Sequence, residues 1–103
     1  MKELKSNEPY DVSPGCPTIT FDLVDESLML AYSSFVSGSF KGNRIELLFQ
    51  DWRIEVEGCE LSEVWGLLQM QDLRVVRLST ERSDGRNGEC RIKKIITTKI
   101  VVK

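Results

Sequence analysis

The chain has 103 residues, of which 41% are hydrophobic and 29% charged, and its formal net charge is −2. This length and balance are typical of a single globular domain and exclude a low-complexity or fibrous chain. No apolar run approaches the ~20 residues of a membrane-spanning helix. The segment Met1–Val12 also lacks the apolar core of a secretion signal. We therefore expect a cytoplasmic protein without a membrane partner.

The side-chain inventory argues against the commonest catalytic and metal sites. There is no histidine, the residue that most often serves as a general base or metal ligand. Cys16, Cys59 and Cys90 are too far apart in the sequence for a zinc motif, and no histidine is present to activate any of them. No glycine-rich segment has the spacing of a phosphate-binding loop. We predict no catalytic, metal-binding or cofactor-binding residues, and no enzyme.

The chain divides into a lead-in and one domain. Residues 1–17 are polar and rich in turn-forming proline, and we predict a flexible lead-in there. Residues 18–103 form the predicted single β-rich domain, in which the charged, glycine-containing segment 79–89 is a solvated loop.

Hydrophobic periodicity places five short strands before a helix. Alternation of apolar and polar residues predicts strands, and Gly42-Asn43 is typical of a two-residue hairpin turn. Ala31–Ser34 is expected to form a bend or a single helical turn. The strand segments in chain order are Thr18–Val24, Leu28–Leu30, Phe35–Lys41, Ile45–Phe49 and Trp52–Glu57.

The period then changes to that of a helix. Leu61, Val64, Trp65 and Leu68 follow the i, i+3, i+4, i+7 spacing of an apolar helical stripe, which predicts a helix over residues 60–70. Two further strands follow, Leu73–Leu78 and Arg91–Lys103. The last of these is apolar on much of both faces, so we expect it to pair within its own chain or with a neighbouring subunit.

The predicted fold is α+β and mainly β. It is an antiparallel meander of about five short strands, one helix and two further strands, with a strongly bent small barrel as an alternative. The parity of the strands and the helical spacing predict a core made of Ile19, Phe21, Leu23, Ile45, Leu47, Phe49, Ile54, Val56, Leu61, Val64, Trp65 and Leu68.

Acidic residues alternate with apolar ones on two of the strands. Glu46, Glu55 and Glu57 are therefore expected on a solvated sheet face, beside the cross-strand cations Arg44 and Arg53. This interpretation is favoured over a pair of catalytic carboxylates.

Charge is distributed unevenly along the chain. Residues 73–103 hold nine basic and three acidic residues, a balance of +6, and residues 1–72 hold five basic and thirteen acidic, a balance of −8. The basic residues either complement the acidic strands or form a surface for a nucleic acid or another partner. The candidate surface consists of Arg74, Arg77, Arg91, Lys93, Lys94 and Lys99.

Three segments carry a resemblance to known proteins. The chain resembles small uncharacterised bacterial β-rich proteins at Ala31-Tyr32, Arg53–Val56 and Val56–Leu61. The resemblance implies a fold and no activity. The succession of short strands also invites comparison with Sm-like RNA-binding barrels. That family has an early Asp-Gly turn and an Asp with an Asn on its third strand, and this chain has Asp25-Glu26 and Ile45–Leu47 there.

The expected function is that of a non-enzymatic binding or assembly module, because a complete core pattern comes without a catalytic constellation. Another protein or a second copy of the chain is the expected partner. The alternative is a nucleic-acid-binding small β-barrel that uses the basic C-terminal segment.

Overall fold

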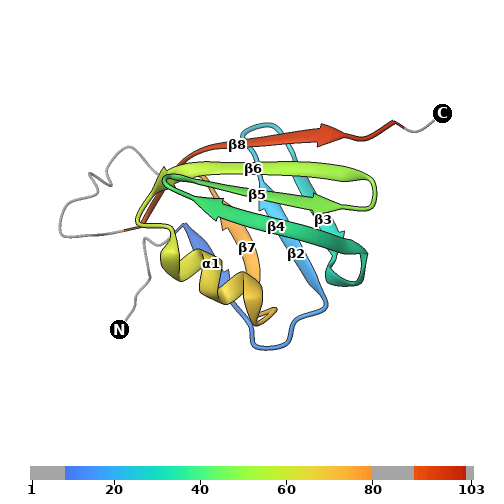
Figure 1. Cartoon of the computed structure of the whole chain (residues 1–103), viewed down its shortest axis with the longest axis horizontal. Helices are drawn as coiled ribbons and strands as arrows, with labels where there is room; N and C mark the ends of the chain where they lie inside the picture. Colours follow the sequence, from blue (N-terminus) through green and yellow to red (C-terminus); the bar gives the residue numbers. More distant parts are fainter. Residues whose placement is uncertain (1–8, 80–89, 102–103) are drawn as a thin grey trace.

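The computed structural model describes residues 9–79 and 90–101. Eight strands in these residues form two four-stranded sheets that face each other (Figure 1). The first sheet contains, in spatial order, β1 (Tyr10–Val12), β7 (Leu73–Arg77), β2 (Thr18–Asp22) and β3 (Ser27–Ala31). The second contains β4 (Phe35–Lys41), β5 (Arg44–Phe49), β6 (Trp52–Cys59) and β8 (Arg91–Lys99).

The predicted fold class is confirmed, and the meander is divided between the sheets. β4, β5 and β6 are consecutive antiparallel neighbours, and β2 and β3 form an antiparallel hairpin in the other sheet. The short 3₁₀ helix η1 (Tyr32–Ser34) turns the chain from one sheet to the other, where a bend or helical turn was predicted. The strands of the two sheets cross steeply in Figure 1. The alternative of a closed barrel is wrong for the described residues.

The two strands after the helix join different sheets. β7 inserts between β1 and β2 and runs parallel to β2, which makes the first sheet mixed. β8 pairs antiparallel with β6, so the terminal strand is paired within its own chain, one of the two predicted arrangements. It ends at Lys99, before the predicted end at Lys103, and residues 102–103 lie outside the described part.

Part of the predicted lead-in belongs to the first sheet. Tyr10 is 5% exposed and Tyr10–Val12 pairs with β7, so this part of the predicted lead-in is a strand of the first sheet. Ser13 and Cys16 donate backbone hydrogen bonds to the carbonyls of Asp72 and Gln71. Three strand residues are too few for an alternation to be recognised in the sequence. Residues 1–8, and the predicted loop 79–89 except Ser79, lie outside the described residues.

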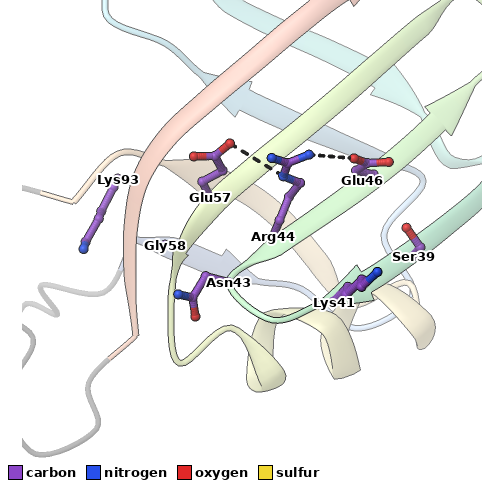
Figure 2. Close-up of a pocket in the computed structure, with 8 residues that line it drawn as sticks. All are labelled: Ser39, Lys41, Asn43, Arg44, Glu46, Glu57, Gly58 and Lys93. Carbon is purple, nitrogen blue, oxygen red and sulfur yellow. Dashed lines mark hydrogen bonds and ion pairs between the residues drawn. The ribbon is translucent and has the colours of Figure 1, made fainter.

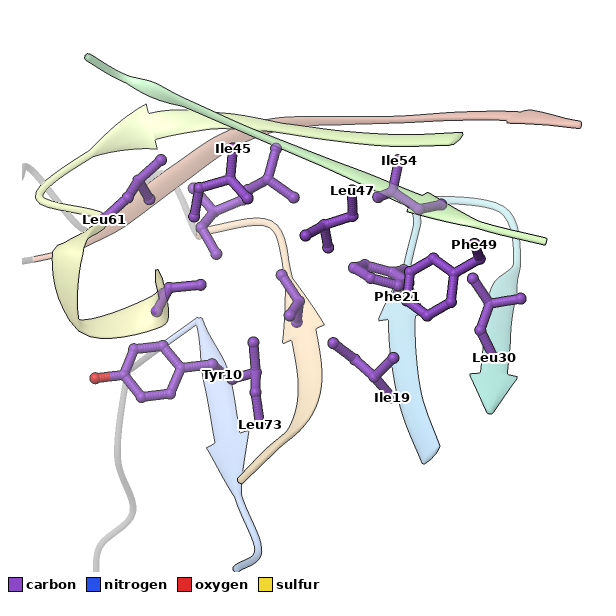
Figure 3. Close-up of a cluster of buried hydrophobic side chains, with 14 residues drawn as sticks. Tyr10, Ile19, Phe21, Leu30, Ile45, Leu47, Phe49, Ile54, Leu61 and Leu73 are labelled. Carbon is purple, nitrogen blue, oxygen red and sulfur yellow. The ribbon is translucent and has the colours of Figure 1, made fainter. Parts of the chain in front are cut away.

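The core lies between the sheets (Figure 3). Nine of the twelve predicted core residues are buried, and Leu23, Trp65 and Leu68 are half-buried instead. Leu23 lies in the β2–β3 turn, beyond the end of the strand, where its N–H binds the carbonyl of Glu26. The core also takes in residues that the parity argument omitted: Tyr10, Leu30, Leu73, Val76 and Ile92.

The helix α1 (Ser62–Gln69) is shorter than predicted because Glu60 and Gln71 adopt left-handed backbone angles, φ 54° and 61°. Leu61 and Val64, at the start of the helical segment, are buried in the core. Trp65 instead lies against Phe40 of β4, with ring centroids 5.8 Å apart. Within the described residues, no helix has the length and apolarity needed to cross a membrane.

Candidate functional site

The six predicted basic residues do not form one surface. Arg74 and Arg77 lie on β7, and the other four lie on β8 in the opposite sheet. Arg77 donates to Asp11 of β1 at 2.8 Å, and Arg74 approaches the same carboxylate at 3.9 Å. An acidic residue of the N-terminal half therefore complements two basic residues of the C-terminal half within one sheet.

The basic residues of β8 lie along β6. Lys94 is the register partner of Glu57, and Lys99 is that of Trp52, with its ammonium nitrogen 5.7 Å from the indole centroid. This distance is that of a cation–π contact. Lys93, Lys94 and Lys99 are exposed.

The outer face of the second sheet has a polar depression of about 720 Å³ (Figure 2). At its centre the Arg44 guanidinium lies between two carboxylates, 3.1 Å from Glu46 and 3.6 Å from Glu57. The hydrogen bond with Glu46, and then the charge of Glu57, raise the pKa of Arg44. The depression is lined by Ser39, Lys41, Asn43, Arg44, Glu46, Glu57, Gly58 and Lys93.

Arg44 pairs with carboxylates of a partly exposed sheet face, as predicted, whereas Arg53 is the register partner of Leu48 and Thr98. Glu46 and Glu57 are partly exposed and each is paired with Arg44, and Glu55 is the cross-strand neighbour of Glu46. Because the one guanidinium in the depression serves two carboxylates, it is poorly suited to bind a phosphate in addition.

The surroundings of the cysteines do not resemble a metal site in the described residues. Cys16 and Cys59 carry free thiols. Buried Cys16 directs its Sγ toward the carbonyls of Gln71 and Leu73, each at 3.6 Å. Tyr32 donates its hydroxyl to the same Leu73 carbonyl at 2.5 Å, and burial raises the pKa of that hydroxyl. No cluster of possible metal ligands occurs in residues 9–79 and 90–101.

The feature most relevant to binding is the free edge of β4. Among the described strands, β4 pairs only with β5, so its other side presents unpaired backbone groups. Its side chains are exposed except Phe40, and they include Phe35 at 41% and Val36 at 56%. An unpaired strand with exposed apolar side chains is a template for pairing with another strand.

The two long edges of this sheet differ in charge. β8, at the opposite edge, carries Arg91, Lys93, Lys94 and Lys99, and charged residues on an edge discourage strand addition. β4 has no charged residue before Lys41, its last. Charged side chains therefore occur along the β8 edge, whereas the β4 edge carries one only at its end.

The uncharged character of this edge is visible in the sequence. The segment Ser27–Phe40 contains no Asp, Glu, Lys or Arg, in a chain that is 29% charged. It spans β3, η1 and all of β4 except Lys41, and β3 and β4 each lie at one edge of their sheet. Which strands lie at an edge depends on long-range pairing, so the periodicity of the strand could not reveal it.

The register with β5 indicates which backbone groups of β4 face outward. Gly42 has φ 61° and opens a two-residue turn flanked by the pair Lys41 and Arg44. In such a hairpin the flanking pair exchanges backbone hydrogen bonds, and the residues of each strand then alternate. Ser39 and Lys41 thus face β5 with their N–H and C=O groups, and the groups of Gly38 and Phe40 point to the open edge.

Comparison of the chain with protein-family models, with curated proteins and with solved structures finds no match.

Proposed function

We propose that the protein is a non-enzymatic binding and assembly module, and that it binds protein partners by adding an extended segment to the open edge of β4. The observation that carries this proposal is the contrast between the two edges of one sheet, of which β8 is strongly basic and β4 is uncharged before Lys41.

When an extended segment adds to the edge of a sheet, its backbone and its side chains make different contributions to binding. Main-chain hydrogen bonds along the edge supply affinity, and apolar contacts beside it select the partner. β4 offers both, since Gly38 and Phe40 face outward with their backbone groups and Phe35 and Val36 are exposed.

Selection of displayed peptides against the whole chain tests this proposal. A lysine at position 36 would place a charge on the edge without removing a buried side chain. Val36→Lys is therefore compared with Val24→Lys, the same substitution at an 83% exposed residue of the β2–β3 turn.

We expect selected peptides to bind the wild-type chain and Val24→Lys equally and to lose about tenfold or more in affinity for Val36→Lys. Failure to select any binder, or equal binding by both lysine variants, would contradict the proposal. Circular dichroism of the two variants checks that both remain folded.

A nucleic-acid surface on β8 is the second proposed function. Its support is that no acidic residue occurs between Arg91 and Lys99 and that three of the lysines are exposed. Titration with single-stranded RNA and DNA at two salt concentrations tests it. Binding through β8 should weaken steeply with salt and respond to Lys93→Glu but not to Val36→Lys.

A further inference from the structure

We infer that the partner of β4 is β4 of a second copy of this chain, paired antiparallel about a two-fold axis that passes beside Gly38. The inference rests on the proposed function, because it names the occupant of the same edge. The resulting dimer joins two four-stranded sheets into one continuous sheet.

The sequence of the strand is nearly symmetric about Gly38. Reading outward from this glycine, Ser37 corresponds to Ser39, and Val36 corresponds to Phe40. An antiparallel pair centred on Gly38 therefore places serine opposite serine and brings Phe40 to Val36, the residue at the register shift between Phe35 and Ser37. A two-fold interface requires such self-complementarity, since the same patch supplies both sides.

The direction of the backbone groups fits the same axis. Gly38 and Phe40 point their N–H and C=O groups to the open edge, as deduced from the register with β5. With the axis at Gly38, this residue meets its own copy as a hydrogen-bonded pair. Phe40 then lies beside Val36 of the other copy, where the regular alternation of β4 ends at the register shift between Phe35 and Ser37. An axis at Ser37 or Ser39 would instead place at the centre a residue whose backbone N–H and C=O groups already form hydrogen bonds with β5.

Aromatic side chains add contact area at the axis. The Phe35 ring covers Gly38 of its own strand, because a Cβ built on Gly38 would lie 3.2 Å from the ring carbon Cζ and 3.0 Å from Cδ2 of Leu47. Two Gly38 residues paired across the axis bring the two Phe35 rings together. This contact buries the exposed part of each ring.

Charge distinguishes this pairing from the other edge pairings. Two copies of β8 would oppose four basic residues to four others, and like charges across strands are destabilising. Two copies of β4 bring one charged residue each, Lys41, which lies opposite the apolar Phe35 of the other copy, so no two like charges face each other directly. A seven-residue strand pair is a small interface, so we expect a reversible dimer whose population depends on concentration.

Sedimentation equilibrium of the whole chain over a wide concentration range gives the first test. We expect wild type and Val24→Lys to dimerise with the same dissociation constant. Val36→Lys and Phe35→Ala should raise that constant by about tenfold or more. A wild-type chain that stays monomeric at all concentrations would overturn the inference. Peptides that still bind the edge in that case would leave the proposed function standing.

Selective disulfide formation tests the register between β4 and β4 of the second copy. Ser37 and Ser39 of opposite copies form the close, non-hydrogen-bonded pair in which a cross-strand disulfide fits. In a chain with Cys59→Ser and Cys90→Ser, equal amounts of Ser37→Cys and Ser39→Cys are mixed and treated with oxidised glutathione. The mixed disulfide should form faster than either symmetric one. A statistical mixture, or a preference for a symmetric product, would overturn the axis at Gly38 even if a dimer forms.

Discussion

Gly58 lies where the backbones of β6 and β8 approach each other closely. The register shifts between Glu57 and Gly58, and a Cβ built at Gly58 would lie 1.9 Å from the Arg91 carbonyl oxygen. Because this neighbour is backbone rather than a flexible side chain, the strands must move apart. Gly58→Ala should lower the free energy of unfolding by about 3 kcal/mol or more.

Gly66 provides the matched control for Gly58→Ala. It lies inside α1, and a Cβ built there meets no atom within 4 Å. Gly66→Ala should raise the free energy of unfolding by about 0.5–1 kcal/mol, because alanine loses less backbone entropy in a helix. Urea denaturation measures both variants. A loss below about 1 kcal/mol for Gly58→Ala would contradict the close approach at the bulge.

Tyr32 connects η1 to β7 through its hydroxyl. Tyr32→Phe removes the hydrogen bond to Leu73 and should cost about 1 kcal/mol near neutral pH. Burial raises the pKa of Tyr32 above its ordinary value of 10.0, so the folded chain keeps this proton to higher pH than the unfolded chain. Stability from neutral Tyr32 is thus complete below pH ~10 and declines above it.

Urea melts of wild type and Tyr32→Phe at a series of pH values test this linkage. The difference in unfolding free energy between the two should shrink as the pH rises above ~10, since only wild type loses stability through this group. A difference that grows with pH would contradict the buried, donating hydroxyl.

At the scale of single elements, replacing a buried aromatic side chain by alanine should lower the free energy of unfolding more than replacing a half-buried one. Phe21 of β2 has no exposed surface and meets Phe49 edge to face at 6.5 Å, whereas Trp65 of α1 is half-buried. Phe21→Ala should cost about 3–5 kcal/mol and Trp65→Ala about 1–2 kcal/mol. Equal costs in denaturant melts would show that α1 depends on Trp65 more than its exposure indicates.

Strong periodicity made some elements predictable. β4 was predicted with its observed bounds, and the alternation in β5 and β6 placed Ile45, Leu47 and Ile54 correctly in the core. Weak periodicity hid others. β1 has three residues, and its pairing with β7 joins segments far apart in the chain. Local sequence pattern carries no information on such a partner.

At the scale of the whole molecule, the strand topology determines which residues share a surface and which strands lie at an edge. The division into two sheets separates Arg74 and Arg77 from the basic residues of β8, so a charge asymmetry along the chain does not become one surface. The same topology leaves β4 at an edge. Basic residues that are close in the sequence form one surface only if the pairing of distant strands brings them to the same face. In the same way, a strand can be recognised as an edge strand only when the partners of all the strands are known.

Amide hydrogen exchange of β4, measured as a function of protein concentration, tests the central claim most directly. In the monomer the Gly38 and Phe40 amides point to the open edge and should exchange rapidly, whereas those of Ser39 and Lys41 are protected by β5. We predict that Gly38 and Phe40 become protected as the concentration rises in wild type and Val24→Lys, and not in Val36→Lys. Rapid, concentration-independent exchange at Gly38 and Phe40 in wild type would contradict pairing of this edge with a second copy.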